Sequence, residues 1–482
     1  MPVIVQPIPY RSPDALAAQF SSEPGCVLLR SGRLDPEQGR HSFLAVRPFL
    51  IFRSHGSRCE VETASGTEVQ YGNPWFLLDQ HIARYELLEE IDIPFPLGGC
   101  FGFWGYDLKQ FVEPKLRATA VDDLELPNCW VGFYDHLLAF DHHLEKAWII
   151  STGIRPDGSR DDALATKRVD WWQSRLMRPE NSGSSEGESV RGQPVASNFS
   201  RDQFVAAVRR AQRYINAGHI YQVNLAQRLS ASYAGQAFSF FQELSSRSPA
   251  PFAAYLNCGS FQLASSSPES FLRIAGSHIR TRPIKGTRPR SSDPIRDAQL
   301  TYELQTSAKE MAELVMITDL LRNDLGRICA YGSVSVPELV RLERYAHVQH
   351  LVSTVEGALR PDMTHFQAMA QCFPGGSITG APKFRAMEII DELEPVTRGP
   401  YTGCFGYVGF NRETQLSITI RTAILHEGQA HYYAGAGIVA DSSPEAEYEE
   451  TLAKAAGFMQ ALGHERAGRL TVNIANQKPG RA

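Results

Sequence analysis

The sequence predicts a large α+β fold in which extensive antiparallel sheets are flanked by helices. Short apolar runs bounded by turn-forming residues indicate many strands, whereas helical periodicity is confined to a few segments. Helices and strands also do not alternate regularly along the chain, as a doubly wound parallel sheet would require. With 482 residues, of which 43% are hydrophobic and 21% charged, the chain has the composition of an ordinary globular protein.

Residues 177–198 interrupt this pattern, because they are rich in Ser, Gly, Glu and Pro and contain few large apolar side chains. Such a segment buries too little surface to offset the entropy lost on ordering. We therefore expect a linker or flexible loop here. It divides the chain into an N-terminal domain, residues 1–176, and a C-terminal domain, residues 199–462, followed by a tail, residues 463–482.

The N-terminal part contains apolar runs at 26–29 and 130–134 that we interpret as strands. The stretch 98–106 alternates glycine with aromatic residues. Glycine inside a strand permits close approach of another backbone, so this stretch predicts a strand packed tightly against its neighbour.

The C-terminal part opens with a clear helix. Ser200 and Gln203 form a capping box, and Gly218 supplies the stop. A second helix is predicted over 298–322 and a terminal helix over 443–462. The apolar face predicted for the second helix comprises Leu304, Ala308, Met311, Val315 and Thr318. Strands are predicted at 261–265, 278–284, 416–422 and 431–436.

The composition argues against several classes of function. A net charge of −5 gives no electrostatic reason to expect nucleic acid or an anionic membrane as partner. The eight cysteines are scattered, which favours reduced, mostly buried thiols over a zinc site or a disulfide framework. We find no signal-peptide pattern and no apolar run long enough to span a membrane, so we expect a cytoplasmic protein.

Two pairs of acidic residues are candidates for a metal site. Glu310 and Glu313 lie three apart on one predicted helix, and Glu447 and Glu450 lie three apart on another. If the two helices face each other, the carboxylates could hold Mg²⁺, which takes oxygen ligands and keeps some sites for water and substrate. Spacing alone favours the alternative of two solvated acidic faces.

Three features are suited to binding an anion. Arg421 lies in the apolar run 417–422, where an unpaired charge is costly and a guanidinium can grip a carboxylate. Gly435, Ala436 and Gly437 follow a strand, and small residues let backbone N–H groups approach a ligand. The glycine-rich run 374–383, which contains Ser377, precedes a helix and could act similarly.

Lys285 lies at the end of a predicted strand, before Gly286-Thr287 and the basic stretch 288–290. A lysine that is desolvated near other cations can act as a nucleophile, although an ordinary exposed lysine would fit the spacing equally well. Glu269 is a candidate general acid or base. His350 fits either a core histidine or a proton carrier.

A set of ordered motifs gives these residues a common context. They are SPESF (267–271), TRPIKGTRPR (281–290), DLLRNDLGR (319–327), HLVSTVEG (350–357), GGSITGAPK (375–383), AMEIIDELEP (386–395), SITIRT (417–422), AGAGIVADS (434–442) and EAEYEET (445–451). In this order they resemble the chorismate-utilising enzymes, densely over residues 199–460 and more loosely over 10–150. The resemblance implies the fold of that family, an N-terminal domain of the anthranilate synthase component I type, a chorismate-binding catalytic domain and dependence on Mg²⁺.

Two positions distinguish the activities within the family. Isochorismate and salicylate synthases carry a water-activating lysine where this chain has Gln222, so water is disfavoured as nucleophile. Anthranilate synthases have alanine where this chain has Lys285, which is typical of the aminodeoxychorismate synthase branch. The resemblance therefore implies chorismate amination through a covalent lysine intermediate, for 4-aminobenzoate and folate biosynthesis. Anthranilate synthase component I is the alternative.

The resemblance also implies roles for individual residues. Glu269 is similar to a general acid/base, Glu313 and Glu450 to direct Mg²⁺ ligands, and Glu310 and Glu447 to neighbouring members of the metal site. His350 resembles a proton-transfer residue of the anthranilate branch. The residues expected around the substrate are Arg421, Tyr401, Ser377, Gly435, Ala436, Gly437, Lys454 and Thr287.

Two expectations concern ligands and partners. The sequence contains no glutaminase motif, so ammonia would come from a separate glutamine amidotransferase subunit in a heterodimer, or from solution. Ser31, Pro251, Phe252 and Ala253 match a tryptophan pocket of the family. In this chain Arg30 stands where an acidic residue would meet the ammonium of tryptophan, which argues against feedback by that amino acid.

Overall fold

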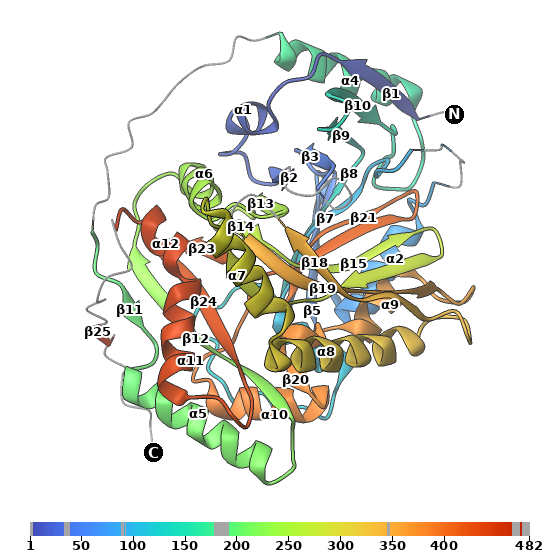
Figure 1. The fold of residues 1–482 in the computed structure, drawn as a ribbon. Coiled ribbons are helices and arrows are strands. Elements are labelled where there is room, and N and C mark those ends of the chain that lie inside the picture. Colours follow the sequence, from blue (N-terminus) through green and yellow to red (C-terminus); the bar gives the residue numbers. More distant parts are fainter. Residues whose placement is uncertain are drawn as a thin grey trace.

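The protein consists of two large antiparallel sheets with helices packed around them (Figure 1). The computed structural model describes residues 3–32, 39–87, 91, 93–177, 192–344, 348–464 and 473–474. Most of the predicted linker and of the predicted C-terminal tail lies outside these residues. The two sheets confirm the predicted α+β class with extensive antiparallel sheet.

The first sheet contains, in spatial order, β1 (Ile4–Ile8), β10 (Lys146–Ser151), β9 (His136–Asp141), β3 (His41–Ala45), β2 (Val27–Ser31), β13 (Phe252–Asn257), β14 (Phe261–Ser267), β23 (Thr422–His426), β24 (Gln429–Ile438), β12 (Gln222–Ser232), β11 (Ala196–Ser197) and β25 (Asn473–Ile474). The short strand β20 (Gly380–Ala381) also pairs with β12. All of these pairs are antiparallel except β11 with β25.

The second sheet contains, in spatial order, β17 (Ile284–Pro289), β19 (Val348–Ala358), β16 (His278–Arg282), β15 (Ser270–Ala275), β22 (Glu413–Ile418), β21 (Cys404–Gly409), β7 (Gly99–Trp104), β8 (Cys129–Tyr134), β4 (Leu50–His55), β5 (Arg58–Thr63) and β6 (Gly66–Tyr71). The strand β18 (Ser335–Arg344) pairs with β19. Both sheets combine strands from before and after the predicted linker, so the two parts of the sequence share both sheets.

The helices cover the sheets and the ends of the strands. They are α1 (Pro13–Ala18), α2 (Pro74–Ala83), η1 (Tyr106–Leu108), α3 (Lys109–Val112), α4 (Asp162–Leu176), α5 (Arg201–Asn216), α6 (Ala237–Arg247), α7 (Pro294–Gln305), α8 (Ala308–Gly326), α9 (His365–Cys372), η2 (Gly376–Ile378), α10 (Lys383–Leu393), α11 (Pro444–Lys454) and α12 (Ala456–Ala461). Figure 1 shows α11 beside β24 and close to α5, and these elements are in contact. The predicted capping box of Ser200 and Gln203 is present on α5, and Gly218 follows with a φ of +77°.

The prediction of one helix over 298–322 is wrong. The segment forms α7 and α8, which are separated at Thr306-Ser307, and the Ser307 side chain caps α8 by accepting a hydrogen bond from the Glu310 amide. The break rotates the second half of the segment, so Leu314 is buried whereas Val315 is 41% exposed. Of the predicted apolar face, Leu304 and Thr318 are buried, whereas Ala308 and Val315 are exposed.

Two predicted strands are also interrupted. The run 278–284 crosses from β16 into β17, so Lys285 lies near the start of a second strand and not at the end of the first. The run 416–422 crosses from β22 into β23, and Arg421 between them has a φ of +49°. The chain leaves one sheet and enters the other at this left-handed residue, and local periodicity cannot reveal such a crossing.

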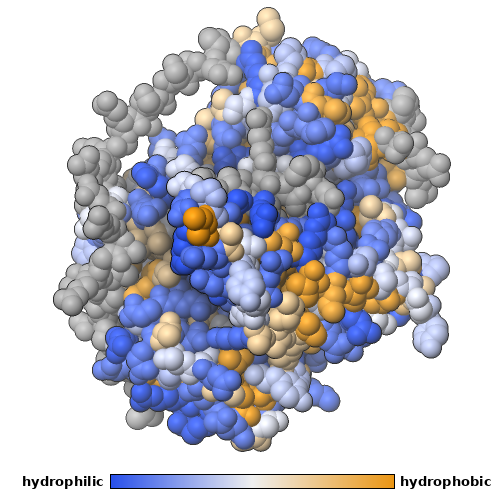
Figure 2. All heavy atoms as spheres, viewed as in Figure 1, coloured by the Kyte–Doolittle hydropathy of each residue, from blue (hydrophilic) through white to orange (hydrophobic). Residues whose placement is uncertain are grey.

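The predicted terminal helix over 443–462 is divided at Ala455 into α11 and α12. The expectation of buried cysteine thiols is confirmed. All eight cysteines are buried and unpaired. Among the described residues, no helix has the length and apolar character needed to cross a membrane. On the face drawn in Figure 2, hydrophobic side chains form separate patches among hydrophilic ones.

The strand β7 approaches its neighbour β8 very closely. The predicted strand packed tightly against another backbone is confirmed, because a Cβ atom added to Gly102 would lie 2.1 Å from the Trp130 carbonyl oxygen on β8. We predict that Gly102→Ala lowers the free energy of unfolding by ~3 kcal/mol or more, because backbone must move to relieve the overlap. Thermal and urea unfolding measure this.

Gly326→Ala is the matched control, because Gly326 ends α8 and a Cβ atom there would meet no heavy atom within 4 Å. We expect this substitution to leave stability unchanged or to raise it by up to ~1 kcal/mol, since alanine favours a helix. Equal stability of the two variants would contradict the prediction for Gly102.

Candidate active site

The pairing of β12 with β24 forms one wall of the site. Asn224 is opposite Gly437, and Ala226 is opposite Gly435. A Cβ atom would lie 2.5 Å from the Gln222 amide nitrogen if added to Gly437. At Gly435 it would lie 2.8 Å from the Tyr401 hydroxyl. Both glycines therefore admit polar side chains directly over the strand.

Ala436 belongs to the opposite face of β24. Its side chain is fully buried in an apolar cluster that includes Val223 and Ile438, so this residue can face a ligand only through its backbone. The run Gly435 to Gly437 therefore faces the candidate site at its two glycines and the apolar cluster at Ala436, as the two-residue repeat of a strand requires.

Tyr401 is held over Gly435 by aromatic and polar contacts. Its ring stacks on that of Tyr433, with centroids 5.1 Å apart and planes inclined by 12°. Burial raises the pKa of the Tyr401 phenol to about 12, although a hydrogen bond with Asn224 and a nearby positive charge act in the opposite direction. The hydroxyl therefore stays protonated near neutral pH and can donate a hydrogen bond to an anion.

Glu269 lies between β14 and β15 and is buried. Burial raises the pKa of its carboxyl, whereas a hydrogen bond from Ser377 and the charges of Lys285 and Lys454 lower it. The structure therefore brings together three of the predicted site residues around one buried carboxyl. Opposing effects on its pKa suit a group that gives and takes a proton.

Lys285 is half-buried on β17, opposite Leu351 of β19. The pairing is irregular between Lys285 and Thr287, where Gly286 has a φ of +67°. A Cβ atom on Gly286 would lie 2.7 Å from Leu304, so only glycine fits the bend. The irregularity re-aims the side chains at this edge of the sheet, as bulges commonly do at functional sites.

His350 lies opposite Thr287 on β19, and its Nδ1 is 2.9 Å from the Thr287 hydroxyl and 3.4 Å from the Gly286 carbonyl oxygen. Burial lowers the pKa of the imidazole to about 4, and the charge of Arg421 contributes in the same direction. His350 is therefore neutral at physiological pH. His350 thus contacts Thr287 and lies close enough to Arg421 for that charge to affect its pKa.

Arg421 is half-buried at the crossing between the two sheets. Its carbonyl oxygen accepts a hydrogen bond of 3.1 Å from the Ser266 amide, which fixes the backbone. Within the described part of the chain its guanidinium forms no ion pair with a carboxylate. A fixed, unneutralised guanidinium is suited to bidentate binding of a carboxylate ligand.

The four predicted acidic residues approach one another from α8 and α11. Burial raises the pKa of Glu313, with Glu310 and Glu450 adding to the rise and Lys285 opposing it. Burial likewise raises the pKa of Glu447, to which the charge of Glu450 contributes. Glu447 is buried, Glu310 and Glu313 are half-buried and Glu450 is exposed, so only part of the acidic set lies on a solvated face.

The carboxylate oxygens are the donors that Mg²⁺ prefers, so the chemistry of this cluster fits that ion. The carboxylates are not arranged as an assembled metal site. Among the described residues, no three His, Cys, Asp or Glu side chains are close enough to hold a metal ion. Glu310 instead lies 3.4 Å from Arg288, and Glu450 lies 2.7 Å from Lys454. The same Lys454 ammonium donates to the Gly435 carbonyl oxygen at 2.9 Å.

The predicted tryptophan pocket is assembled but narrow. Ser31 pairs with Phe252 across β2 and β13, and both line a cavity with Pro251 and Ala253. The cavity holds about 50 Å³, which is small beside the ~300–1,000 Å³ typical of ligand pockets. Arg30 at its edge is paired with Asp14 at 3.1 Å. Tryptophan binding here stays a prediction.

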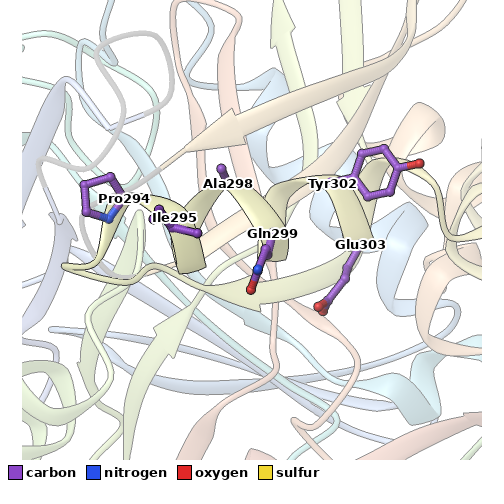
Figure 3. A pocket seen from close by; sticks show the side chains of 6 residues that line it. All are labelled: Pro294, Ile295, Ala298, Gln299, Tyr302 and Glu303. Atoms are coloured by element: carbon purple, nitrogen blue, oxygen red, sulfur yellow. The ribbon is translucent and has the colours of Figure 1, made fainter.

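A larger surface hollow lies elsewhere. It measures about 600 Å³ and is lined by Pro294, Ile295, Ala298, Gln299, Tyr302 and Glu303, which project from the exposed side of α7 (Figure 3). None of the predicted site residues lines it. Its size therefore does not identify it as the reaction centre.

The sequence interpretation missed three residues that support the site. Asn224 donates to the Ile378 carbonyl oxygen at 3.1 Å and contacts Tyr401. Glu394 and Arg398 form a buried ion pair behind Tyr401. The four-residue spacing of Glu394 and Arg398 is the one sequence signal for this pair, and the polar run 391–398 around it gave no indication of burial.

Comparison with known proteins agrees with this arrangement. Residues 35–460 match the model of a family described as chorismate binding enzyme. The chain is 37% identical to anthranilate synthase component 1 of Acetivibrio thermocellus, over 95% of this chain and 94% of that protein. It is 38% identical to aminodeoxychorismate synthase component 1 of Escherichia coli K12, over 92% and 95% respectively. The crystal structure of anthranilate synthase component I from Streptococcus pneumoniae superposes with a TM-score of 0.78 at 31% identity, covering 88% of this chain and 92% of that one.

The lowered pKa of His350 predicts a specific pH dependence of stability. The unfolded imidazole takes up a proton near pH 6.5, whereas the folded one resists protonation down to about pH 4. Stability therefore falls as the pH is lowered through this window. We predict that His350→Gln weakens this fall by up to ~3 kcal/mol, measured as unfolding free energy at pH 7.0 and 4.5. Identical pH profiles of variant and wild type would contradict it.

Proposed function

The chain belongs to the chorismate-binding enzyme family, and on that premise we propose that it is the aminating subunit that converts chorismate and ammonia to 4-amino-4-deoxychorismate. One observation supports this choice above the others. Lys285 lies on β17 close enough to Glu269 and Glu313 for its charge to influence both carboxyls. A lysine amine is thereby available as a nucleophile beside a proton donor.

Sequence identity does not choose between the two amination reactions, because relatives named for each match the chain almost equally well. The distinction rests on individual side chains. Gln222 is buried against Gly437, and a neutral amide cannot remove a proton from water. Hydroxylation by water is therefore disfavoured, which leaves an amine as the attacking group.

The first half of the proposed reaction forms a bond to the enzyme. The neutral Lys285 amine attacks C2 of chorismate, the ring double bonds shift, and the bond from C4 to its hydroxyl oxygen breaks. Glu269, in its acid form, supplies the proton with which the hydroxyl leaves as water. The proton released by the attacking amine then restores the acid form of Glu269.

The second half of the proposed reaction moves the ring double bonds back. Ammonia attacks C4, the double bonds return, and the bond between C2 and the Lys285 nitrogen breaks as that nitrogen takes a proton from Glu269. Glu269 then accepts the proton that the ammonium group formed at C4 releases. The net change is replacement of hydroxyl by amine at C4, with the enolpyruvyl group retained. Two displacements through a lysine explain why the nitrogen arrives at C4.

The two substrate carboxylates are proposed to occupy opposite sides of the site. Arg421, the Tyr401 hydroxyl and the backbone at Gly437 bind the carboxylate of the enolpyruvyl arm. Glu313 and Glu450, with Glu310 and Glu447 beside them, would hold Mg²⁺. When bound, that ion supplies positive charge for the ring carboxylate.

We propose that the enzyme works in the cytoplasm with a separate glutamine amidotransferase subunit as its source of ammonia. The relatives are named as component 1, which is consistent with a second component. Anthranilate synthesis is the second candidate function. The observation in its favour is His350, which resembles a proton-transfer residue of that branch and lies beside Thr287 in the site.

Product analysis tests the proposed function. We expect the protein, incubated with chorismate, ammonium and Mg²⁺, to form 4-amino-4-deoxychorismate as identified by chromatography and mass spectrometry. Removal of divalent cations with EDTA should abolish turnover, and added Mg²⁺ should restore it. Fluorescent anthranilate as the main product would assign the second candidate instead, and no turnover of chorismate at all would reject both.

The covalent step makes a separate prediction. Lys285→Ala should lower kcat for C4 amination by at least ~10³-fold, because it removes the nucleophile and not merely a binding contact. Mass spectrometry of the wild type, quenched during turnover without ammonium, should detect an adduct on the peptide containing Lys285.

Lys146→Ala is the control, because Lys146 is an exposed lysine at the start of β10 and remote from the site residues in the sheet order. It should retain wild-type kcat. Full C4-amination activity in Lys285→Ala would exclude the covalent route.

A further inference from the structure

We infer that the buried ion pair between Glu394 and Arg398 is a positioning element for the carboxylate-binding side of the site. It connects Tyr401, the β12 strand and the loop that carries Ser377, and it thereby sets the affinity for chorismate. This inference rests on the proposed function, because it takes chorismate as the ligand. Neither residue touches the proposed position of the substrate, so both act through their neighbours.

The pair is fully enclosed and geometrically complete. Arg398 is 1% exposed and Glu394 is 5% exposed. The Arg398 Nε donates to one Glu394 oxygen at 2.9 Å, and an Arg398 terminal nitrogen donates to the other at 2.6 Å. This two-point contact fixes the plane of the guanidinium, which leaves its remaining N–H groups pointing in defined directions.

The Arg398 and Glu394 side chains also form hydrogen bonds with the backbone along one edge of β12. The short strand β20 pairs with β12 only at Gln222 and Val223. Further along this edge, Arg398 donates to the Asn224 carbonyl oxygen at 2.8 Å, and the Ala226 amide donates to Glu394 at 2.9 Å. The Glu394 and Arg398 side chains therefore take the place of a neighbouring strand at Asn224 and Ala226. On the other edge of β12 these two residues pair with Gly437 and Gly435.

The same guanidinium fixes the loop that carries Ser377. Its second terminal nitrogen donates to the Ile378 carbonyl oxygen at 3.1 Å, the atom that also accepts from the Asn224 amide. The Asn224 backbone amide donates to the neighbouring Thr379 carbonyl at 2.8 Å. Ser377, which hydrogen-bonds Glu269, is thus attached to β12 through the next two residues of its loop.

Arg398 also supports Tyr401 directly. The guanidinium carbon lies 5.6 Å from the centroid of the Tyr401 ring, and a terminal nitrogen donates to the Thr402 hydroxyl at 3.1 Å. Tyr433 stacks on the Tyr401 ring as well, so contacts with both residues hold the ring. A positive charge close to a phenol also makes its hydroxyl a stronger hydrogen-bond donor, which favours binding of an anion.

The ion pair is expected to contribute more to the positions of its neighbours than to the free energy of unfolding. Desolvation of two buried charges costs about as much as their attraction returns, and apolar residues of similar volume often replace such a pair without loss. Removing one partner alone is different, because it leaves an uncompensated buried charge and typically costs ~3–5 kcal/mol. A double replacement can therefore separate positioning from folding.

The test compares wild type with the double variant Glu394→Met/Arg398→Met. We expect similar thermal unfolding midpoints, a KM for chorismate at least ~10-fold higher, and a change in kcat of less than ~3-fold. Titration calorimetry with chorismate in the absence of ammonium should show the same loss of affinity. A well-folded double variant with wild-type KM and affinity would overturn the inference.

Tyr401→Phe tests whether the ion pair acts through Tyr401, which a purely structural role of the pair would not require. In the wild type it should weaken chorismate binding, whereas in the double variant it should have little further effect, because Tyr401 is already displaced. Fully additive effects of the two changes would overturn positioning through Tyr401. If the double variant does not fold, Arg398→Lys is measured instead. It keeps the charge but not the fork of donors, so a raised KM supports the inference and an unchanged KM overturns it.

The outcomes are separable from those of the proposed function. KM is measured from chorismate consumption, so formation of anthranilate would reject the proposed product and leave the positioning test intact. If the wild type consumes no chorismate, the proposed function fails, and the affinity of wild type and double variant in calorimetry still decides the role of the pair. Equal affinities, or no binding by either protein, would overturn it.

Discussion

The pairing of β12 with β24 is the interaction on which the site depends. Ten consecutive residue pairs, from Val223–Ile438 to Ser232–Gln429, join segments that are about two hundred residues apart in the sequence. A shift of one residue would turn Gly435 and Gly437 into the core and Ala436 toward the ligand, because side chains alternate along a strand. The same register also fixes where the chain leaves β24 for α11, and hence where Glu447, Glu450 and Lys454 begin their helix.

The charges around this wall are mixed. Five carboxylates (Glu269, Glu310, Glu313, Glu447 and Glu450) lie near Lys285, Lys454 and Arg288. Arg421 lies on the side of His350. Under the proposed function the substrate brings two further negative charges. Arg421 can accept one directly, but the acidic cluster would repel the other. The acidic side becomes an anion site only with a divalent cation present, which makes the proposed Mg²⁺ part of substrate recognition and not an accessory.

Local features of the sequence predicted what depends on local interactions. The capping box at Ser200 defines α5, and period-two apolar runs locate β14 and β24. The break at Ser307 and the left-handed turn at Arg421 were missed, because a cap and a crossing between sheets override an apolar pattern that continues through them. The sharing of both sheets across residues 177–198 is a non-local pairing, and sequence spacing carries no signal for it. Some of the residues expected around chorismate are neighbours, such as Ser377, Lys285 and Lys454 around Glu269. The burial of the Glu394–Arg398 pair follows only from its contacts.

Under the proposed function, the choice of reaction depends on one side chain on a common scaffold. Lys285 sits on an edge strand next to the bend at Gly286, and its backbone pairs with Leu351 whatever side chain it carries. A smaller residue at this position would keep the strand, the carboxyl of Glu269 and the wall formed by β12 and β24. The chain superposes with a TM-score of 0.78 on a solved anthranilate synthase component I, so the two chains share this scaffold. If the proposed route operates, specificity among the amination reactions resides in which atom attacks the ring first, and the fold supplies the frame within which that atom is held.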